Sequence, residues 1–529
     1  MLRRPFIVAG VLVVAGAAIL NEILRRTGRI DPLWTATASD DGDDDEAAAA
    51  AEQDALRREA ALLARIQSLE ALAVRGAPAR ARPRRGHCGR ESGYALLREL
   101  RASERRLCES TTSSNRSVVT CHAIERYDSL TKSLRFCEFR NVALDLREGV
   151  RVAHPLRCAT CADGGKHDPR FVLTPAHVRC ACRSTSGDDA MAASVVLSAF
   201  GLGKGAKVNL HRSGPLKCDA ETAARWSCDE SFADPVVGIT RADDHNPFFM
   251  ISLALNAWLY MRLRGYTSEA RVVFLDGAGT TSMAPLFRRV LSPRWPLLFG
   301  DRALDKRRTC FATLALMPPE STGPLMTHLN DAQRCGSSRL VRDFVRYVHA
   351  AFHDESDADA HAAVHDVAAP RADGADERKL RVTFASRADY GNRSIARQLE
   401  NEPQLADAWA ALGAFDVRRV LFERESFEAQ VAVVRRTDVL VGMHGAGMAH
   451  ALWLPQGARV IEVFPAHKRR WGYRNMCQYA GCLYTQFRGG VDVRLDGGDF
   501  SKRVDVEEWL DFVGQWLLQA GLQHFLREP

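Results

Sequence analysis

The sequence predicts an α/β protein with two domains. Helical and strand patterns alternate along its second half, and a glycine-rich loop lies between two short apolar runs within residues 437–464. A polar stretch at residues 353–379, almost without large apolar side chains, separates two regions of regular pattern. We therefore expect an α/β domain at residues 87–352, a linker or insertion at residues 353–379, and a second α/β domain at residues 380–529.

Length and charge limit the number of domains and the kinds of partner to expect. The chain has 529 residues, enough for two or three domains with full cores. Its formal charge of +7 is small for this length, and the basic residues are spread along the chain. Nucleic acid is therefore not an expected partner.

The N-terminus predicts a membrane anchor. Arg3 and Arg4 precede an apolar run over residues 5–20, and continuing to Leu24 gives about the ~20 residues that a membrane-spanning helix needs. A cleaved signal peptide is the alternative, since Ala15-Gly16-Ala17 resembles a cleavage site. An uncleaved anchor at residues 1–24 is favoured because an acidic and helical segment follows it. We expect a single-pass type II protein of the Golgi or endoplasmic reticulum membrane, with its body in the lumen.

Residues 25–86 predict a stem. An acidic and alanine-rich stretch at residues 39–51 is followed by residues 52–74, whose leucines fit one face of a helix. This helix is either a solvated stalk or a short coil that forms a homodimer. A proline- and arginine-rich break at residues 76–86 ends the stem.

Cysteines and sequons agree with a lumenal body. The chain has 14 cysteines, an even number that can pair in an oxidising compartment. The spacing of four of them fits a zinc site or disulfides, and disulfides are favoured in the lumen; these are Cys158, Cys161, Cys180 and Cys182. Asn115 begins a predicted glycosylation site, and a second sequon begins at Asn392.

Four elements mark the two domains. Residues 246–263 predict an amphipathic helix and residues 271–277 a strand that ends in a loop. Residues 380–384 predict the first strand of the second domain, and residues 504–526 an amphipathic helix near the end of the chain.

The most informative stretch runs from a buried strand through a glycine loop. Residues 437–443 predict the strand, residues 448–454 have helical composition, and residues 459–464 predict a second strand. The loop between them is His444, Gly445, Ala446 and Gly447. A helix N-terminus behind a glycine loop offers free N–H groups that suit phosphate, although an ordinary tight turn has the same composition. The spacing matches neither the dinucleotide nor the P-loop motif.

Two arginines and a glutamate complete the predicted site. Arg387 follows the strand at residues 380–384, and Arg393 comes soon after it. An arginine at the carboxyl end of a strand is well placed to pair with phosphate oxygens, although a single arginine is more often simply exposed. Glu462 ends a strand where a carboxylate can bind ribose hydroxyls. Together these residues predict a nucleotide diphosphate pocket.

The same residues resemble glycosyltransferase family 61. The likeness lies in Ser386, Arg387, Arg393, Asn401 and Glu402, in "VLVGMHGAG", and in "LPQGARVIEVFP". The family includes plant-type β-1,2-xylosyltransferases and the N-acetylglucosaminyltransferases that act on EGF domains and on O-mannose. The resemblance implies a GT-B fold, in which two Rossmann-like domains face each other. It also implies inverting transfer of a sugar, xylose or N-acetylglucosamine, from a UDP-sugar to a glycan or glycoprotein hydroxyl.

The resemblance also implies roles for the site residues. Arg387 would face the diphosphate, residues 444–447 would close over it, and Glu462 would hold the ribose. Positive charge would then stabilise the departing UDP, so that no metal or other cofactor is expected. Asp-x-Asp triplets, such as those at residues 41–43 and 357–359, lie in acidic stretches unlike a metal site.

The chain differs from the family at the positions where the catalytic base is expected. Phe249 and Leu253 stand where the family carries a histidine and an aspartate. Asp244 and His245 are the nearest candidates for the base, although with Asp243 they also fit a cap for the following helix. The alternative function is a catalytically inactive, glycan-binding or scaffolding protein. A sulfotransferase is disfavoured because no lysine-bearing phosphosulfate loop is present.

Overall fold

The computed structural model describes most of the body of the protein. The described residues are 93–109, 117–124, 134–147, 177–181, 183–184, 217–218, 226–241, 246–266, 270–276, 279–318, 320, 322–326, 329, 336–352, 379–389, 395–466, 468–495 and 500–522. The chain divides into two compact units, mainly residues 1–86 and His87–Arg527, and all described residues belong to the second. The predicted anchor, stem and linker therefore lie outside the described residues, apart from Lys379. Among the described helices, none has the length and apolar character to cross a membrane.

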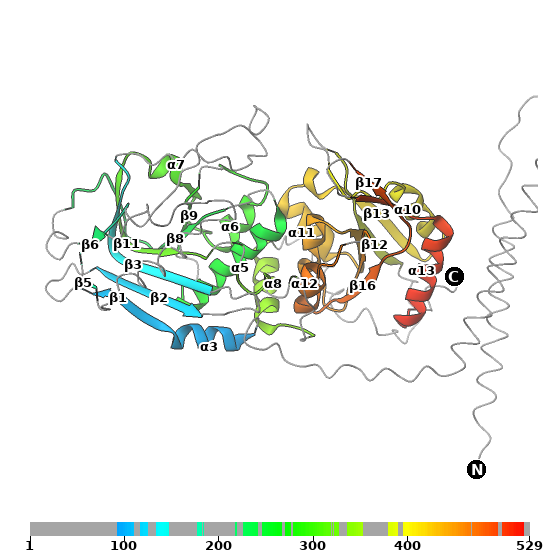
Figure 1. Ribbon diagram of the computed structural model, residues 1–529, viewed down its shortest axis with the longest axis horizontal. Helices are drawn as coiled ribbons and strands as arrows, with labels where there is room; N and C mark the ends of the chain where they lie inside the picture. The colour runs from blue at the N-terminus through cyan, green and yellow to red at the C-terminus, as the bar shows by residue number, and fades with distance from the viewer. Residues whose placement is uncertain are drawn as a thin grey trace, which may run out of the picture. The chain divides into compact units, whose positions relative to one another are not determined.

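The first sheet is mixed (Figure 1). Its strands are β1 (Glu104–Glu109), β2 (Val118–Ile124), β3 (Leu134–Asp145), β4 (Val178–Cys180), β5 (Arg183–Ser184), β6 (Lys217–Cys218), β7 (Glu230–Phe232), β8 (Val236–Ile239), β9 (Arg271–Phe274), β10 (Leu298–Phe299) and β11 (Arg308–Leu316). They lie in the order β10-β9-β8-β11-β3-β2-β1-β5, with β4, β6 and β7 beside this path. Strands β8 to β11 are parallel where they pair, whereas β1, β2, β3 and β11 pair antiparallel. This sheet differs from the parallel one expected of a Rossmann-like domain, because consecutive strands joined directly must run antiparallel.

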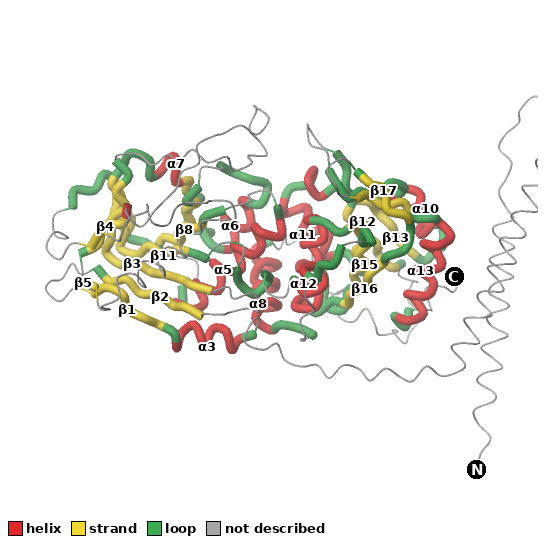
Figure 2. Tube along the Cα trace, in the orientation of Figure 1, coloured by secondary structure: helices red, strands yellow, loops and turns green. Residues whose placement is uncertain are grey.

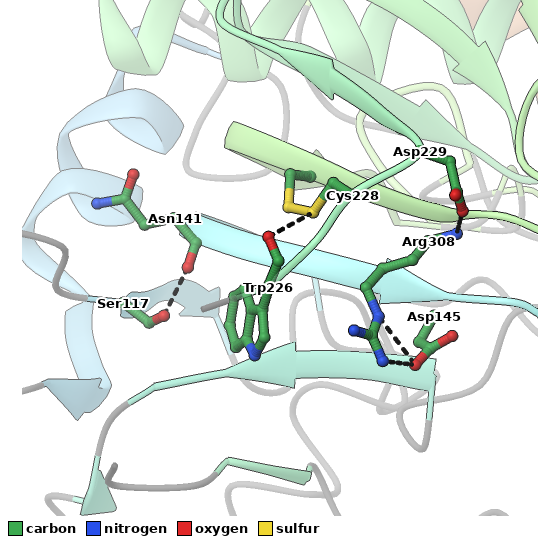
Figure 3. The surroundings of a disulfide bond; sticks show 8 residues. Ser117, Asn141, Asp145, Trp226, Cys228, Asp229 and Arg308 are labelled. Atoms are coloured by element: carbon green, nitrogen blue, oxygen red, sulfur yellow. Dashed lines mark hydrogen bonds and ion pairs between the residues drawn. A yellow bond between two sulfur atoms is a disulfide. The ribbon is translucent and has the colours of Figure 1, made fainter. Parts of the chain in front are cut away.

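Disulfides fasten this sheet. Cys121 of β2 bonds to Cys137 of β3, its direct partner in the antiparallel register. Figure 3 shows the surroundings of Cys228, which bonds to Cys310 of β11. There the Arg308 backbone N–H donates to Asp229 and its guanidinium donates to Asp145 at 2.7 Å. The bonds to Arg147 and Arg308 hold the pKa of Asp145 well below its usual value.

Five helices accompany this sheet. They are α3 (Tyr94–Ala102), α5 (Pro247–Arg264), α6 (Ala284–Val290), α7 (Gly300–Ala303) and α8 (Arg339–Ala351) among the described residues. The predicted helix at 246–263 is confirmed as α5, but it is buried along most of its circumference rather than amphipathic. Its N-cap is Asn246, whose side chain accepts from the Phe248 N–H. Asn246 thus fills the N-cap position of α5, and residues 243–245, for which a cap role was considered, lie outside the described residues.

The second sheet is wholly parallel. Its strands are β12 (Leu380–Ala385), β13 (Phe415–Val420), β14 (Val439–Met443), β15 (Arg459–Val463) and β16 (Leu483–Phe487), in the order β13-β12-β14-β15-β16. The accompanying elements are α10 (Glu402–Ala410), η5 (Phe422–Arg424), α11 (Phe427–Arg435), η6 (Ala446–Trp453), α12 (Gly472–Ala480), α13 (Val506–Gln519) and a hairpin of β17 (Val491–Arg494) and β18 (Phe500–Arg503). Alternation of parallel strands with helices confirms the predicted α/β class. The predicted strands at 380–384 and 459–464 are confirmed as β12 and β15.

One apolar core runs through helices from both regions. Phe344 of α8 lies 5.6 Å from the ring of Trp258 in α5 and 5.9 Å from that of Trp453 in η6. Figure 2 shows α5, α8 and α12 next to one another between the two groups of strands. The same buried cluster continues to Cys477 and Cys482, which form a disulfide at the end of α12. The helices that cover the two sheets thus share one core.

Candidate functional site

Basic side chains lie at one edge of the parallel sheet. Arg387 follows β12, His444 follows β14, and Arg488 follows β16. Because these strands run in the same direction, their carboxyl ends lie along one edge of the sheet. This edge is where ligands bind in open α/β sheets.

The glycine loop enters a short helix directly. Gly442 in β14 has room for no side chain, since a Cβ there would lie 2.7 Å from Met448 Sδ and 3.1 Å from Ala385 Cβ. After Gly445 the chain forms η6, so the predicted helix at 448–454 begins two residues earlier and has 3₁₀ geometry. The first two N–H groups of such a helix have no partner within it. Over the described residues no acceptor is recorded for the N–H of half-exposed Ala446 or Gly447.

Arg387 lies against this loop. Its guanidinium donates to the Ala396 carbonyl at 3.0 Å. A Cβ added at Gly445 would collide with the same guanidinium. The loop therefore carries a glycine where the cation packs on its backbone, and the structure brings Arg387 and residues 444–447 together.

Three other motif residues hold the segment that carries Arg387. The Ser386 hydroxyl donates to Glu402, which also accepts from Arg419 at 3.0 Å. Asn401 donates to the Val504 carbonyl at 2.6 Å and accepts from its N–H at 3.1 Å. Ser386, Asn401 and Glu402 thus act as supports rather than as groups free to meet a ligand.

His444 and Glu462 form a buried pair. His444 Nδ1 lies 2.5 Å from Glu462 Oε1, and the exposed fractions of the two side chains are 9% and 1%. The other Glu462 oxygen accepts from the hydroxyl of Tyr484 in β16. Burial and then the charge of Glu462 raise the pKa of Tyr484 well above its usual value, so the hydroxyl stays a donor. With both oxygens engaged inside the protein, Glu462 faces His444.

Aromatic rings surround His444. Phe464 stacks on its ring at 4.7 Å between centroids, and Tyr473 of α12 lies 5.4 Å away. Burial, followed by the charge of Glu462, raises the pKa of Tyr473. Tyr473 also meets Phe248 edge-on at 5.5 Å. The N-terminus of α5 therefore contacts the surroundings of the glycine loop.

Several predicted residues cannot be placed. Arg393, Asp244, His245, Asn115, Cys158, Cys161 and Cys182 lie outside the described residues. Cys180 is disulfide-bonded. At the two positions where the resemblance leads us to expect a histidine and an aspartate, Phe249 packs against the core and Leu253 is completely buried in α5.

Two residues of the site were missed in the sequence. Tyr484 lies on a strand that was not predicted, and nothing in its local pattern marks a partner of Glu462. His450 in η6 is buried, with its ring nitrogens 2.8 Å from the Gly447 carbonyl and from Gln430 Oε1. In the sequence, the position of His450 three residues after Gly447 was the feature that could have indicated this contact. His450 therefore supports the loop from behind.

No group of three or more metal-ligating side chains occurs within the described part of the chain. The guanidinium and N–H groups described above are donors suited to an anion. The site can therefore hold phosphate oxygens through groups of its own.

Comparison with known proteins agrees with these features. Residues 311–461 match the family model for glycosyltransferase 61, which covers β12, the glycine loop and most of β15. Three similar proteins are named EGF domain-specific O-linked N-acetylglucosamine transferase. The Drosophila melanogaster protein is 30% identical over 182 residues, 34% of this chain and 31% of that protein. The Xenopus laevis protein is 28% identical over 234 residues (40% and 39%), and the Rattus norvegicus protein 28% over 244 residues (43% and 41%). The chain thus spans less than half of the length of these relatives.

Proposed function

Because this chain belongs to glycosyltransferase family 61, we propose that it transfers a sugar from a UDP-sugar to a hydroxyl of a glycoprotein, with inversion at the anomeric carbon. The names of the relatives support N-acetylglucosamine as the sugar and a protein as the acceptor. Xylose is the second candidate, from the resemblance of the sequence to xylosyltransferases. A GT-B arrangement, with the donor on the parallel sheet, belongs to this proposal.

The packing of Arg387 on Gly445 is the observation that carries the proposal. It puts a guanidinium beside the N–H groups of Ala446 and Gly447, at the carboxyl edge of a parallel sheet. A departing diphosphate gains negative charge, and preorganised donors that face this charge stabilise the transition state. These donors would take the place of a metal ion. Arg393 is assigned to the same diphosphate by its position in the sequence.

The role proposed for the general base depends on the position of α5. Asp244 and His245 directly precede Asn246, the N-cap of this helix, and Phe248 in its first turn contacts Tyr473. Contact between the start of α5 and the surroundings of His444 supports Asp244 or His245 as the general base. We assign Glu462 to the orientation of His444 instead of to the ribose, because both of its oxygens are already engaged.

The proposed location is the lumen of the Golgi or endoplasmic reticulum, behind an N-terminal anchor. Three disulfides support an oxidising compartment: Cys121–Cys137, Cys228–Cys310 and Cys477–Cys482. Dimerisation through the stem and glycosylation at Asn115 are parts of the same proposal.

Release of UDP by the full-length chain tests the function. The chain is incubated with UDP-N-acetylglucosamine, UDP-xylose and other UDP-sugars, in excess EDTA, with folded EGF domains as acceptors. We expect turnover of one donor under chelation and, for Arg387→Ala, a loss of UDP affinity of about 1.5–3 kcal/mol, the scale for a hydrogen bond to a charged group. Turnover that requires added divalent metal would contradict the metal-free mechanism.

A binding protein without catalysis is the second candidate. The observation in its favour is that Phe249 and Leu253 occupy core positions where the family carries a histidine and an aspartate. Retained UDP binding without transfer or hydrolysis, across all donors and acceptors offered, would support it. Replacement of Asp244 and His245 by alanine separates the two: the enzyme loses turnover, whereas a binding protein has none to lose.

A further inference from the structure

A hydrogen-bonded chain of three side chains lies behind the glycine loop. The Tyr484 hydroxyl donates to Glu462, and Glu462 lies 2.5 Å from His444 Nδ1. Glu462 is 1% exposed, so the protein rather than water provides these hydrogen bonds. The three residues come from β16, β15 and the end of β14, which are adjacent strands.

The chain determines which nitrogen of His444 carries a proton. A carboxylate accepts hydrogen bonds at both oxygens, and Tyr484 already donates to one of them. The imidazole atom that faces the other oxygen must therefore be a donor, which places a proton on Nδ1. Nε2 then has either a lone pair, in the neutral ring, or a second proton, in the imidazolium.

Charges of opposite sign lie near the ring. Glu462 of β15 lies beside Nδ1 of the ring, whereas the guanidinium of Arg387 packs on the neighbouring Gly445. Phe464 and Tyr473 flank the ring, and burial raises the pKa of Tyr473, so this phenol stays neutral. An anion beside Arg387 would offset the arginine charge and favour the second proton on His444.

We propose that Glu462 and Tyr484 are positioning residues that keep one proton on His444 Nδ1, so that binding of a nucleoside diphosphate adds a second proton, from solvent, at Nε2. The inference rests on the proposed function for the identity of the ligand. His444 then supplies a second positive charge beside Arg387, and its Nε2–H donates to a phosphate oxygen. The proton returns to solvent when the diphosphate leaves.

Calorimetry with UDP as the probe measures this proton directly. Binding to the full-length chain is recorded between pH 6 and 9, in pairs of buffers with different ionisation enthalpies. We expect the wild type to take up a fraction of a proton per UDP, and His444→Asn to take up none. Glu462→Gln is expected to abolish the uptake and weaken UDP binding about tenfold, as loss of a charged hydrogen bond implies. In this variant Tyr484 donates to the amide oxygen, so the amide N–H₂ faces Nδ1 of His444. Because two donors cannot face each other, His444 then carries its proton on Nε2, which is the wrong tautomer for the proposed role.

Conservative changes provide the controls. Tyr484→Phe leaves the carboxylate in place but removes the hydrogen bond to its other oxygen, so we expect proton uptake to fall in part, with UDP affinity within about threefold of the wild type. Tyr347→Phe removes a hydroxyl from α8 and should change neither quantity. Nitrogen-15 NMR of histidine-labelled protein, with the His444 signal assigned from His444→Asn, should show Nδ1 protonated before UDP is added.

The outcomes separate this inference from the function it rests on. Tight UDP binding without proton uptake in the wild type, or uptake unchanged in Glu462→Gln, overturns the positioning role and leaves the transferase proposal intact. A free-state His444 with its proton on Nε2 also overturns it. No UDP binding by a folded wild type overturns the proposed function instead. If Glu462→Gln does not fold, Tyr484→Phe tests the positioning role: proton uptake as large as in the wild type overturns it, and reduced uptake supports it.

Discussion

A glycine is required at position 445 because the Arg387 side chain packs against it, and not because of its backbone conformation. Its φ of 176° and ψ of 177° are extended values that any residue adopts. A Cβ at this position would nevertheless collide with the Arg387 guanidinium. The glycine and the arginine are therefore two parts of one arrangement, although they are far apart in the sequence.

Gly445→Ala should displace Arg387 without unfolding the sheet. We expect UDP affinity to fall about tenfold, on the scale of one charged hydrogen bond, as measured by calorimetry. Gly514→Ala in α13 is the matched control, because a Cβ there has no neighbour within 4 Å. The control should keep UDP affinity and gain up to about 1 kcal/mol of stability from its helix position. Equal UDP affinity in the two variants would contradict the role given to Gly445.

His450 links the stability of the loop to pH. Its ring stacks on Phe422 at 4.0 Å between centroids, and burial lowers the pKa of His450 to about 4. In the unfolded chain a histidine has a pKa of about 6.5. Between these values the unfolded state binds more protons, so stability rises with pH.

The free energy of unfolding should therefore fall as the pH drops from about 6.5 to about 4. The contribution of His450 to this fall is up to about 3 kcal/mol, on the order of two pKa units. Urea unfolding at several pH values, for the wild type and for His450→Gln, measures the difference. A difference between the two proteins that does not change with pH would show that the histidine is not held neutral.

At the scale of elements, the segment between β12 and α10 is held by the hairpin of β17 and β18. The Gln398 N–H donates to Ser501 Oγ at 3.1 Å, and the Glu400 N–H donates to the Lys502 carbonyl at 2.9 Å. Lys502 is completely buried and pairs with Asp492 at 2.7 Å. The segment that carries Arg387 is thus fixed by residues about a hundred positions later.

Asn401→Ala should loosen this attachment, because it removes both hydrogen bonds to Val504. We expect a loss of stability of about 1–3 kcal/mol, as for two hydrogen bonds, and weaker UDP binding. Gln404→Ala on the exposed side of α10 is the control and should stay within about 0.5 kcal/mol of the wild type. Chemical denaturation gives the stabilities and calorimetry the affinities. Unchanged UDP affinity in a destabilised Asn401→Ala would show that the hairpin does not position Arg387.

At the scale of the whole body, one of the buried apolar clusters joins helices that lie beside the two sheets. The cluster that contains Trp258, Phe344 and Trp453 includes residues from Leu96 to Cys482. Helices that share such a core lose their packing together.

We therefore expect residues 87–527 to unfold in a single thermal transition. Phe344→Ala should lower the midpoint of the whole transition, with a cost of about 3–5 kcal/mol, because the ring contacts helices on both sides. Scanning calorimetry of the full-length chain makes the measurement. Two separate transitions in the wild type would show that the sheets are independent domains.

Local patterns allowed three of the five strands of the parallel sheet to be predicted. Strands β12, β14 and β15 are short, almost completely buried and rich in large apolar residues, and this composition marks them in the sequence. The antiparallel arrangement of the first sheet was not predicted, because its pairing joins residues such as Arg308 and Asp145 that are distant in the chain. The amphipathic assignment of α5 was wrong because packing on several sides depends on elements elsewhere.

The sequence alone predicts the α/β class, the glycine loop, the resemblance to glycosyltransferase family 61 and the candidate residues Arg387, His444 and Glu462. These follow from side-chain patterns within a few tens of residues. Only the tertiary structure decided that Glu462 faces His444, that Tyr484 completes the pair, and that Arg387 packs on Gly445. Hydrogen bonds and close packing depend on which strands lie side by side, and strand order is a property of the folded sheet rather than of any local segment.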